Sequence, residues 1–292
     1  MAPDPAVAEG SLEALQGLPC IRLTTEQGDS ALVALHGAQV LSWVAGGRER
    51  LYLSPRAVFN GQSAIRGGLP LCFPQFNQRG PLPKHGFARN LAWRRVAACK
   101  EGDAQSALCL ELTDSDATRT WWPKRFAAQL TVTLGAGSLR VQLAVHHTGN
   151  RDEGAWDFTT ALHTYLCVED VGRAQLTGLD GCARWDALAD ARGVQQGPVT
   201  FSGEYDRVFR APAGAIHLHD GAHGLQITQS TSLASTVVWN PGADLCARLP
   251  DMPHDGFRSM LCVEAAQIDQ PVTLAPGQPW QGWQELRVLP GW

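Results

Sequence analysis

The chain has 292 residues, of which 44% are hydrophobic and 18% charged, and its formal net charge at pH 7 is −4. These values are typical of a soluble globular protein that buries a sizeable core, and they do not indicate disorder. Lysine and arginine are scattered, so the sequence gives no support for a nucleic-acid or anionic-membrane partner. An anionic ligand would therefore have to be held by a local cluster of cations.

The N-terminus and the cysteines indicate a cytoplasmic location. The first ten residues contain Asp4 and Glu9 and lack the basic and apolar regions of a secretion signal. No apolar run reaches the length of about 18 residues that a transmembrane helix requires. The eight cysteines include no Cys-x-x-Cys pair, and most lie in apolar, strand-like runs. We therefore expect reduced, buried thiols and no membrane partner.

Alternating apolar and polar residues, the period of a β-strand, recur along most of the chain. Residues 130–134 and 139–145 flank a short turn and predict a β-hairpin. Residues 216–218 and 225–227 predict a second hairpin across an Asp-Gly turn. The other expected strands are residues 31–43, 106–112, 158–168, 235–239 and 260–265.

Many short strands separated by glycine, proline and aspartate turns predict an all-β sandwich or barrel rather than alternating strands and helices. Helical periodicity is limited to short pieces at residues 12–16 and 184–191. Because no linker or composition break divides the chain, we expect one domain over residues 15–292. We expect residues 1–14 to form a flexible N-terminal extension.

A cationic segment is the densest local signal for ligand binding. Residues 64–76 place Arg66 beside two glycines and before two prolines, and residues 84–90 contain Lys84 and Arg89. Glycine lets the backbone approach a ligand closely, proline stiffens the loop, and guanidinium and ammonium groups bind phosphate oxygens. The segment fits a phosphate pocket, and the same spacing also fits cations on a solvated surface.

Two titratable residues stand in strand-like runs. Alternation over residues 158–168 places His163 on the face of Ala161 and Tyr165, and Glu264 lies among apolar neighbours. Burying a carboxylate is costly unless it has a partner or a chemical task. A catalytic acid–base pair and a structural His–Glu pair both satisfy this pattern.

Other kinds of site find less support. His217, His219 and His223 have no fourth ligand at matching spacing, so we expect no metal. The sequence has no Gly-x-Ser-x-Gly elbow, P-loop or dinucleotide fingerprint, which removes the usual evidence for serine hydrolysis, phosphoryl transfer and nicotinamide chemistry. Most of the ten tryptophans should lie in the core, and one or two can stack on a sugar ring, but spacing does not identify which.

A series of motifs in fixed order spans nearly the whole chain. The motifs are Leu35-His36-Gly37-Ala38-Gln39-Val40-Leu41-Ser42-Trp43, Ala64-Ile65-Arg66-Gly67-Gly68, His85-Gly86-Phe87-Ala88-Arg89-Asn90, Leu162-His163-Thr164-Tyr165, Tyr205-Asp206-Arg207-Val208-Phe209, Trp239-Asn240-Pro241 and Cys262-Val263-Glu264-Ala265. In this order they resemble the hexose-6-phosphate mutarotase branch of the aldose 1-epimerase family. The ordered combination is far more specific than any single motif.

The resemblance implies a galactose-mutarotase-like β-sandwich, or supersandwich, of large antiparallel sheets with few short helices, and a site on a concave sheet face. It also implies that His163 and Glu264 are the catalytic pair. Glu264 would be the general base on the O1 hydroxyl of a sugar, and His163 the general acid toward the ring oxygen. Such proton transfers require no cofactor and no metal.

The resemblance further implies that Arg66 and Arg89 lie on the phosphate side of the ligand and that Asp206 contacts sugar hydroxyls. Lys84 falls on a ligand position where relatives carry a neutral polar residue. Residues 242–259 depart from the Lys-rich, acidic run of the family, although Asp251 and Asp255 remain. The expected enzyme is a monomeric isomerase that interconverts the α and β anomers of an aldohexose 6-phosphate, such as glucose 6-phosphate. An epimerase for free aldoses and a non-catalytic carbohydrate-binding module are the alternatives.

Overall fold

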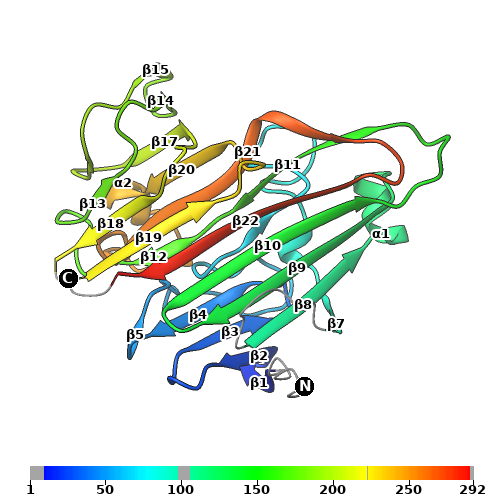
Figure 1. Ribbon diagram of the computed structural model, residues 1–292, viewed down its shortest axis with the longest axis horizontal. Coiled ribbons are helices and arrows are strands. Elements are labelled where there is room, and N and C mark those ends of the chain that lie inside the picture. The colour runs from blue at the N-terminus through cyan, green and yellow to red at the C-terminus, as the bar shows by residue number, and fades with distance from the viewer. Residues whose placement is uncertain (1–9, 98–105, 222, 290–292) are drawn as a thin grey trace, which may run out of the picture.

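The computed structural model describes residues 10–97, 106–221 and 223–289. In this part of the chain, nearly all of the regular structure is β-strand, and the paired strands form three antiparallel sheets (Figure 1). The expected all-β class with large antiparallel sheets is therefore confirmed.

The three sheets differ in size. The five-stranded sheet has the order β1 (Ser11–Leu15), β2 (Leu18–Thr24), β3 (Ser30–Ala34), β4 (Val40–Ala45) and β5 (Arg48–Glu49). The nine-stranded sheet has the order β16 (Val199–Thr200), β13 (Gln175–Thr177), β18 (Ile216–Asp220), β19 (His223–Gln229), β22 (Pro279–Val288), β10 (Ser138–His147), β9 (Phe126–Gly135), β8 (Ser106–Thr113) and β7 (Arg94–Val96). The eight-stranded sheet has the order β15 (Ala191–Val194), β14 (Ala183–Asp186), β17 (Tyr205–Arg210), β20 (Ser235–Asn240), β21 (Met260–Leu274), β11 (Trp156–Leu162) and β6 (Leu71–Cys72), and β12 (Tyr165–Cys167) also pairs with β21.

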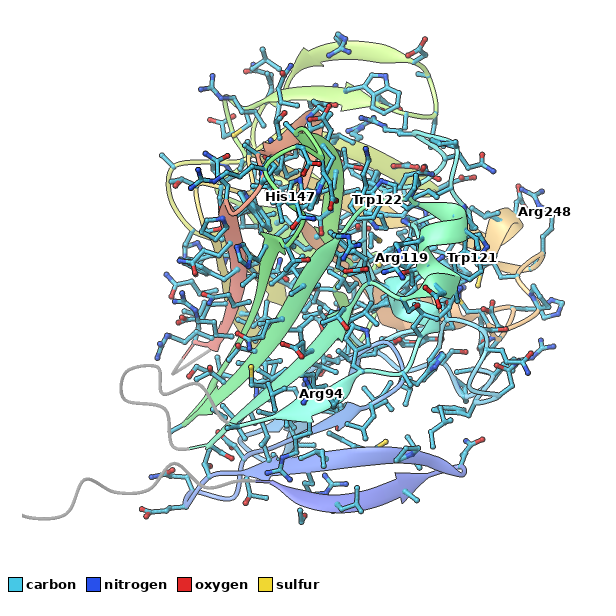
Figure 2. All side chains as sticks on the ribbon, turned by 90° about the vertical axis from the view of Figure 1, so that its right-hand side faces the viewer. Arg94, Arg119, Trp121, Trp122, His147 and Arg248 are labelled. Atoms are coloured by element: carbon cyan, nitrogen blue, oxygen red, sulfur yellow. The ribbon has the colours of Figure 1, made fainter. Side chains whose placement is uncertain are left out.

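The helices are short. Within the described ranges they are α1 (Asp116–Trp121), α2 (Gly242–Cys246) and the 3-10 helices η1 (Ala88–Asn90) and η2 (Gly256–Ser259). No helix in these ranges has the length and apolar character needed to cross a membrane. Figure 2 shows Trp121 and Trp122 at the end of α1, where Trp121 is 51% exposed and Trp122 packs against the core.

The prediction of short helical segments at residues 12–16 and 184–191 is wrong. The first lies in β1, which pairs with β2, so the sheet begins at Ser11, before the expected domain boundary at residue 15. Residues 1–9 of the expected extension lie outside the described residues. The second piece lies in the hairpin of β14 and β15. Over such short segments the helical and strand periods are hard to distinguish, and pairing with a neighbouring strand decides the conformation.

Both expected hairpins are confirmed, as β9–β10 and β18–β19. In β10, alternation turns Leu139, Val141, Leu143 and Val145 into the main core, where each is at most 1% exposed. Seven of the eight cysteines lie in the described residues, and all seven are free thiols; Cys99 lies outside them. The core therefore forms by apolar burial, without a disulfide in the part of the chain that is described.

Strand β21 has two different faces, and this difference positions the site. Leu261, Val263 and Ala265 point into the main core, whereas Cys262 and Glu264 point to the opposite face of the eight-stranded sheet. After β21 the chain passes into β22 of the nine-stranded sheet, between β19 and β10. The sandwich thus fixes one face of β21 by packing and leaves the other face for chemistry.

The motif at residues 35–43 supports the segment that carries Arg66. The buried Gln39 side chain donates from Nε2 to two carbonyl oxygens of that segment, at 2.9 and 2.6 Å. Gly68 adopts a positive φ of 63°, and a Cβ atom there would lie 2.2 Å from the Val40 carbonyl oxygen. Only glycine allows the two backbones to approach this closely. The glycines of the motif are therefore needed for packing as well as for any ligand.

We expect Gly68→Ala to lower the free energy of unfolding by about 3 kcal/mol, because the new Cβ atom collides with backbone at an unfavourable φ. Gly47→Ala is the matched control, since Gly47 also has a positive φ of 74° but has no other atom within 4 Å of the Cβ position. Its cost should be about 1 kcal/mol. Urea denaturation measures both values, and equal losses would contradict the close approach at Val40.

Candidate active site

A cavity of about 440 Å³ lies on the face of the eight-stranded sheet that points away from the main core. All the site residues expected from the sequence line this cavity: Arg66, Lys84, Arg89, His163, Asp206 and Glu264. They come from segments far apart in the chain, so only the fold brings them together. The cationic segment is therefore part of a pocket and not merely a solvated surface.

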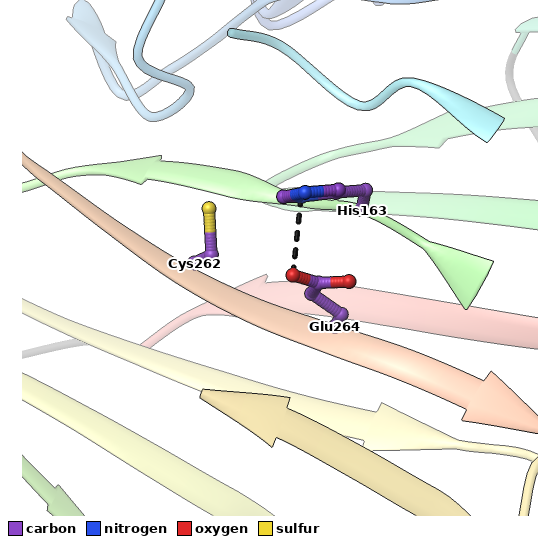
Figure 3. Close-up of side chains that lie close together, drawn as sticks. All are labelled: His163, Cys262 and Glu264. Carbon is purple, nitrogen blue, oxygen red and sulfur yellow. Dashed lines mark ion pairs between the residues drawn. The ribbon is translucent and has the colours of Figure 1, made fainter. Parts of the chain in front are cut away.

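His163 and Glu264 approach each other at the centre of the candidate site. The His163 Nδ1 and Glu264 Oε1 atoms are 3.2 Å apart, and the two residues are only 8% and 2% exposed (Figure 3). This contact is not a hydrogen bond, because His163 Nδ1 has no hydrogen-bond partner among the described residues. The other carboxyl oxygen, Glu264 Oε2, has no partner there either. Two buried polar atoms thus remain unsatisfied, which costs about 1–3 kcal/mol each.

His163 does not lie inside one continuous strand, as the alternation over residues 158–168 predicted. It lies in an irregular step between β11 and β12, both of which pair with β21. Its backbone N–H donates to the Pro70 carbonyl oxygen, and its ring stacks on Tyr165 with centroids 4.8 Å apart. The step and the stacking fix the ring next to Glu264 on the neighbouring strand.

The surroundings favour the uncharged form of both groups. Burial, followed by the nearby Asp206 carboxylate, raises the pKa of Glu264 well above the usual carboxyl range. Burial, followed by His85 and Arg89, lowers the pKa of His163 well below that of a free imidazole. The pocket therefore favours a protonated carboxyl beside a neutral imidazole, so the pair holds one acidic proton.

Arg66 is already engaged by the protein. Its Nε donates to Asp251 Oδ2 at 3.1 Å and its Nη1 to the Tyr165 hydroxyl at 3.0 Å. The nearby Tyr165 oxygen, followed by Asp251, raises the pKa of the guanidinium, so Arg66 stays charged. Asp251 is one of the two acidic residues that the segment 242–259 retains from the family pattern, and its role as the partner of Arg66 was not expected from the sequence.

Lys84 and Arg89 provide less compensated positive charge. Arg89, in η1, donates from Nη2 to the carbonyl oxygen of Lys84 at 3.0 Å. Within the described residues, neither Lys84 nor Arg89 forms an ion pair. This end of the pocket consequently carries excess positive charge and suits a dianion such as a phosphate group.

Asp206 enters the pocket from β17, opposite Trp239 on the neighbouring strand β20. Burial, followed by repulsion from Glu204, raises the pKa of Asp206 to about 6. At neutral pH this side chain is therefore a partly buried carboxylate that can accept hydrogen bonds from sugar hydroxyls. Trp185 and Trp239 line the same pocket and are therefore the candidates for stacking on a sugar ring, which spacing alone did not provide.

His85 is a site residue that the sequence reasoning missed as a functional group, although its motif was recognised. The Asn77 backbone N–H donates to His85 Nδ1 at 3.3 Å, and the buried Cys72 thiol lies 3.0 Å from the same nitrogen. Burial, followed by Arg89 and Lys84, lowers the pKa of His85 to about 3. The ring is therefore neutral with Nδ1 as an acceptor, and its proton is on Nε2. His85 can donate a hydrogen bond to a ligand but cannot act as a base through Nδ1.

Of the three histidines considered for zinc, His217 and His219 do not line this pocket. His217 and His219 lie on β18 in the nine-stranded sheet, where His219 Nε2 contacts the Thr177 hydroxyl at 3.4 Å. The side chain of His223 lies outside the described residues.

We expect nitrogen-detected NMR of the imidazole rings to show His85 as a neutral ring protonated at Nε2 between pH 5 and 8. Its signals can be assigned by their loss in His85→Gln. The physical reasons are the Asn77 backbone N–H group, which donates to Nδ1, and the burial of the ring. A titration near the free-imidazole value of about 6.5 would contradict this assignment.

Comparisons with known proteins agree with the site and the fold. A family model described as Aldose 1-epimerase matches residues 19–287. A protein of Cenchrus ciliaris with the provisional name glucose-6-phosphate 1-epimerase is 34% identical over 284 residues, which cover 94% of this chain and 86% of that protein.

Solved structures extend the comparison to the fold. A crystal structure from Salmonella typhimurium, described provisionally as a mutarotase, superposes with a TM-score of 0.86 at 33% identity and covers 96% of this chain and 93% of that one. A galactose mutarotase related enzyme from Lactobacillus acidophilus shares the fold, with a TM-score of 0.70 at 14% identity and coverage of 93% and 98%. The expected galactose-mutarotase-like β-sandwich is confirmed, and the chain belongs to the aldose 1-epimerase family.

Proposed function

We propose that this protein is a mutarotase that interconverts the α and β anomers of an aldohexose 6-phosphate, with glucose 6-phosphate as the first candidate. The observation that carries the proposal is one pocket with a buried acid–base pair, His163 and Glu264 at 3.2 Å, beside the poorly compensated cations Lys84 and Arg89. The name of the Cenchrus ciliaris relative supports the same substrate class.

Mutarotation requires two opposed proton transfers. One proton leaves the anomeric O1 hydroxyl and another reaches the ring oxygen O5, so that the C1–O5 bond opens to the aldehyde. We assign the first transfer to Glu264 as general base and the second to His163 as general acid. After rotation about C1–C2 the roles reverse, and the ring closes from the other face. Each transfer contributes about 10²–10⁴-fold to the rate.

This assignment needs a Glu264 carboxylate and a protonated His163, which is the same pair with its one proton held by the imidazole instead of the carboxyl. Arg66 and Arg89 are among the charges that lower the pKa of His163. A bound phosphate dianion offsets these positive charges, so substrate binding favours the protonated imidazole. The sugar O1 hydroxyl in turn donates a hydrogen bond to the Glu264 carboxylate and stabilises it.

The other pocket residues position the substrate. Lys84, Arg89 and the engaged Arg66 lie on the phosphate side, Asp206 accepts from sugar hydroxyls, and the neutral His85 donates from Nε2 to a sugar oxygen. An anchored phosphate holds C6 while C1 moves, so binding energy far from the reacting bond retains the open-chain aldehyde in the pocket.

One observation favours the alternative of a free aldose as substrate. Arg66 is paired with Asp251, and a carboxylate at this position repels a phosphate. In that alternative Arg66 is structural and the pocket binds an uncharged sugar. The choice between the two substrates therefore depends on Lys84 and Arg89.

We also propose that the protein acts as a monomer in the cytoplasm. The pocket is lined by residues of a single chain, so no second copy is needed to complete it. The free cysteines of the described residues fit a reducing compartment.

We expect Glu264→Gln to lower kcat about 10²–10⁴-fold, because the amide cannot accept the O1 proton. The measurement dissolves crystalline α-glucose 6-phosphate, and in parallel α-glucose, and follows anomer exchange by NMR. The control is Glu111→Gln, which changes a glutamate on β8 of the nine-stranded sheet, away from the pocket. A folded Glu264→Gln protein with the wild-type rate would make His163 and Glu264 a structural pair.

We expect Lys84→Ala and Arg89→Ala to raise the KM for glucose 6-phosphate about 10- to 100-fold, because each variant loses one charged hydrogen bond to the phosphate. Their rates with glucose should change little. Arg94→Ala is the control, because Arg94 is exposed on β7 at the edge of the nine-stranded sheet (Figure 2). An unchanged KM for the phosphate sugar would favour the epimerase for free aldoses.

A further inference from the structure

Cys262 lies beside the acid–base pair and has no role in the proposed reaction. It lies two residues before Glu264 on β21, so both side chains point to the same face of the strand. The possible metal-ligand atoms of His163, Cys262 and Glu264 all lie within 4.8 Å of one another, and the three residues are buried (Figure 3). An imidazole and a carboxyl group that line the pocket thus converge with a thiol buried directly beside it.

These three groups are the ligand types that Zn²⁺ binds in proteins, with bonds of about 2.0–2.3 Å. Such bonds place the ligand atoms of a tetrahedral site about 3–4 Å apart. The separation of 3.2 Å between His163 Nδ1 and Glu264 Oε1 already meets this requirement. A side-chain shift of about 1 Å brings the Cys262 thiol into range, and the fourth position is open to water in the pocket.

A second observation points to a ligand at the same place. His163 Nδ1 and Glu264 Oε2 are enclosed and have no hydrogen-bond partner among the residues that the structure describes. A metal ion that accepts their lone pairs would remove the cost of leaving buried polar atoms unsatisfied. The site therefore has donor atoms that are positioned but not otherwise used.

The positive charges of the pocket do not exclude an ion here. Arg66, Lys84 and Arg89 oppose a bare dication, but binding releases one proton from the Cys262 thiol and one from the Glu264 carboxyl. One Zn²⁺ enters and two protons leave, so the complex with one thiolate, one carboxylate and one neutral imidazole is formally neutral. The local charge of the pocket is then nearly unchanged.

We propose that His163, Cys262 and Glu264 form a binding site for a thiophilic divalent metal ion, with Zn²⁺ as the reference, and that the bound ion inhibits the enzyme. Coordination occupies both groups that must move protons, so the metal is an inhibitor and not a cofactor. The binding site stands on the geometry alone, whereas the inhibition rests on the proposed mutarotase function.

Cobalt(II) provides a test that does not depend on activity, because a cobalt–thiolate bond gives a charge-transfer band in the near ultraviolet. We expect the wild-type protein to bind one Co²⁺ with this band and to release it when Zn²⁺ is added. Cys262→Ala should lack the band. The matched control is Cys20→Ala, which removes another fully buried thiol, from a separate cluster of apolar residues.

The inhibition is tested by titrating Zn²⁺ into the glucose 6-phosphate assay, with the metal-free rate of each variant as its own reference. We expect Zn²⁺ to inhibit the wild type and Cys20→Ala equally, a chelator to reverse this, and Cys262→Ala to need at least tenfold more Zn²⁺. Cys262→Ser, with nearly the same side-chain volume, replaces the alanine variant if that variant does not fold.

Three results would overturn the metal site: no thiolate band in the wild type, a band that persists in Cys262→Ala, or equal inhibition of the two alanine variants by Zn²⁺. A thiolate band in a wild-type protein without mutarotase activity would support the metal site and overturn the proposed function. The two proposals can therefore fail separately.

Discussion

The approach of His163 Nδ1 and Glu264 Oε1 to 3.2 Å inside the pocket is the interaction on which the rest of the site depends. Burying two titratable groups with unsatisfied atoms lowers the free energy of unfolding. Packing elsewhere in the fold must offset this loss if the two groups are to stay together. The sandwich supplies this stability because one face of β21 is packed into the main core. The opposite face of the same strand can then carry Cys262 and Glu264 while the fold remains stable.

The loops around the pocket are held by buried polar contacts rather than by apolar packing alone. Gln39 binds the carbonyl oxygens beside Arg66, and Asn240 donates to the Phe257 and Met260 carbonyl oxygens, each at 2.8 Å. These contacts connect the irregular segments to the ends of strands. They explain why motif residues that do not face the pocket accompany those that do.

The sequence allowed the all-β class, both hairpins and the six pocket residues to be predicted, because alternation is a local property and because the ordered motifs resemble a known family. Other features depend on contacts between distant segments. The role of Asp251 appears only when its loop reaches Arg66, and the neutral state of His85 depends on Asn77 and on burial. The short strands β1 and β14 were mistaken for helix because their conformation is set by the neighbouring strand.

Substrate binding and proton position are coupled through the same side chains. Arg66 and Arg89 lower the pKa of His163, and Arg89 and Lys84 also oppose the effect of burial on the pKa of Glu264. A phosphate dianion at this end of the pocket offsets the positive charges that lower the pKa of His163, so it favours the charged imidazole, while the O1 hydroxyl of the sugar stabilises the Glu264 carboxylate. An uncharged sugar cannot produce this change. The preference for a phosphorylated substrate would therefore appear in kcat as well as in KM, because the phosphate prepares the acid that protonates the ring oxygen.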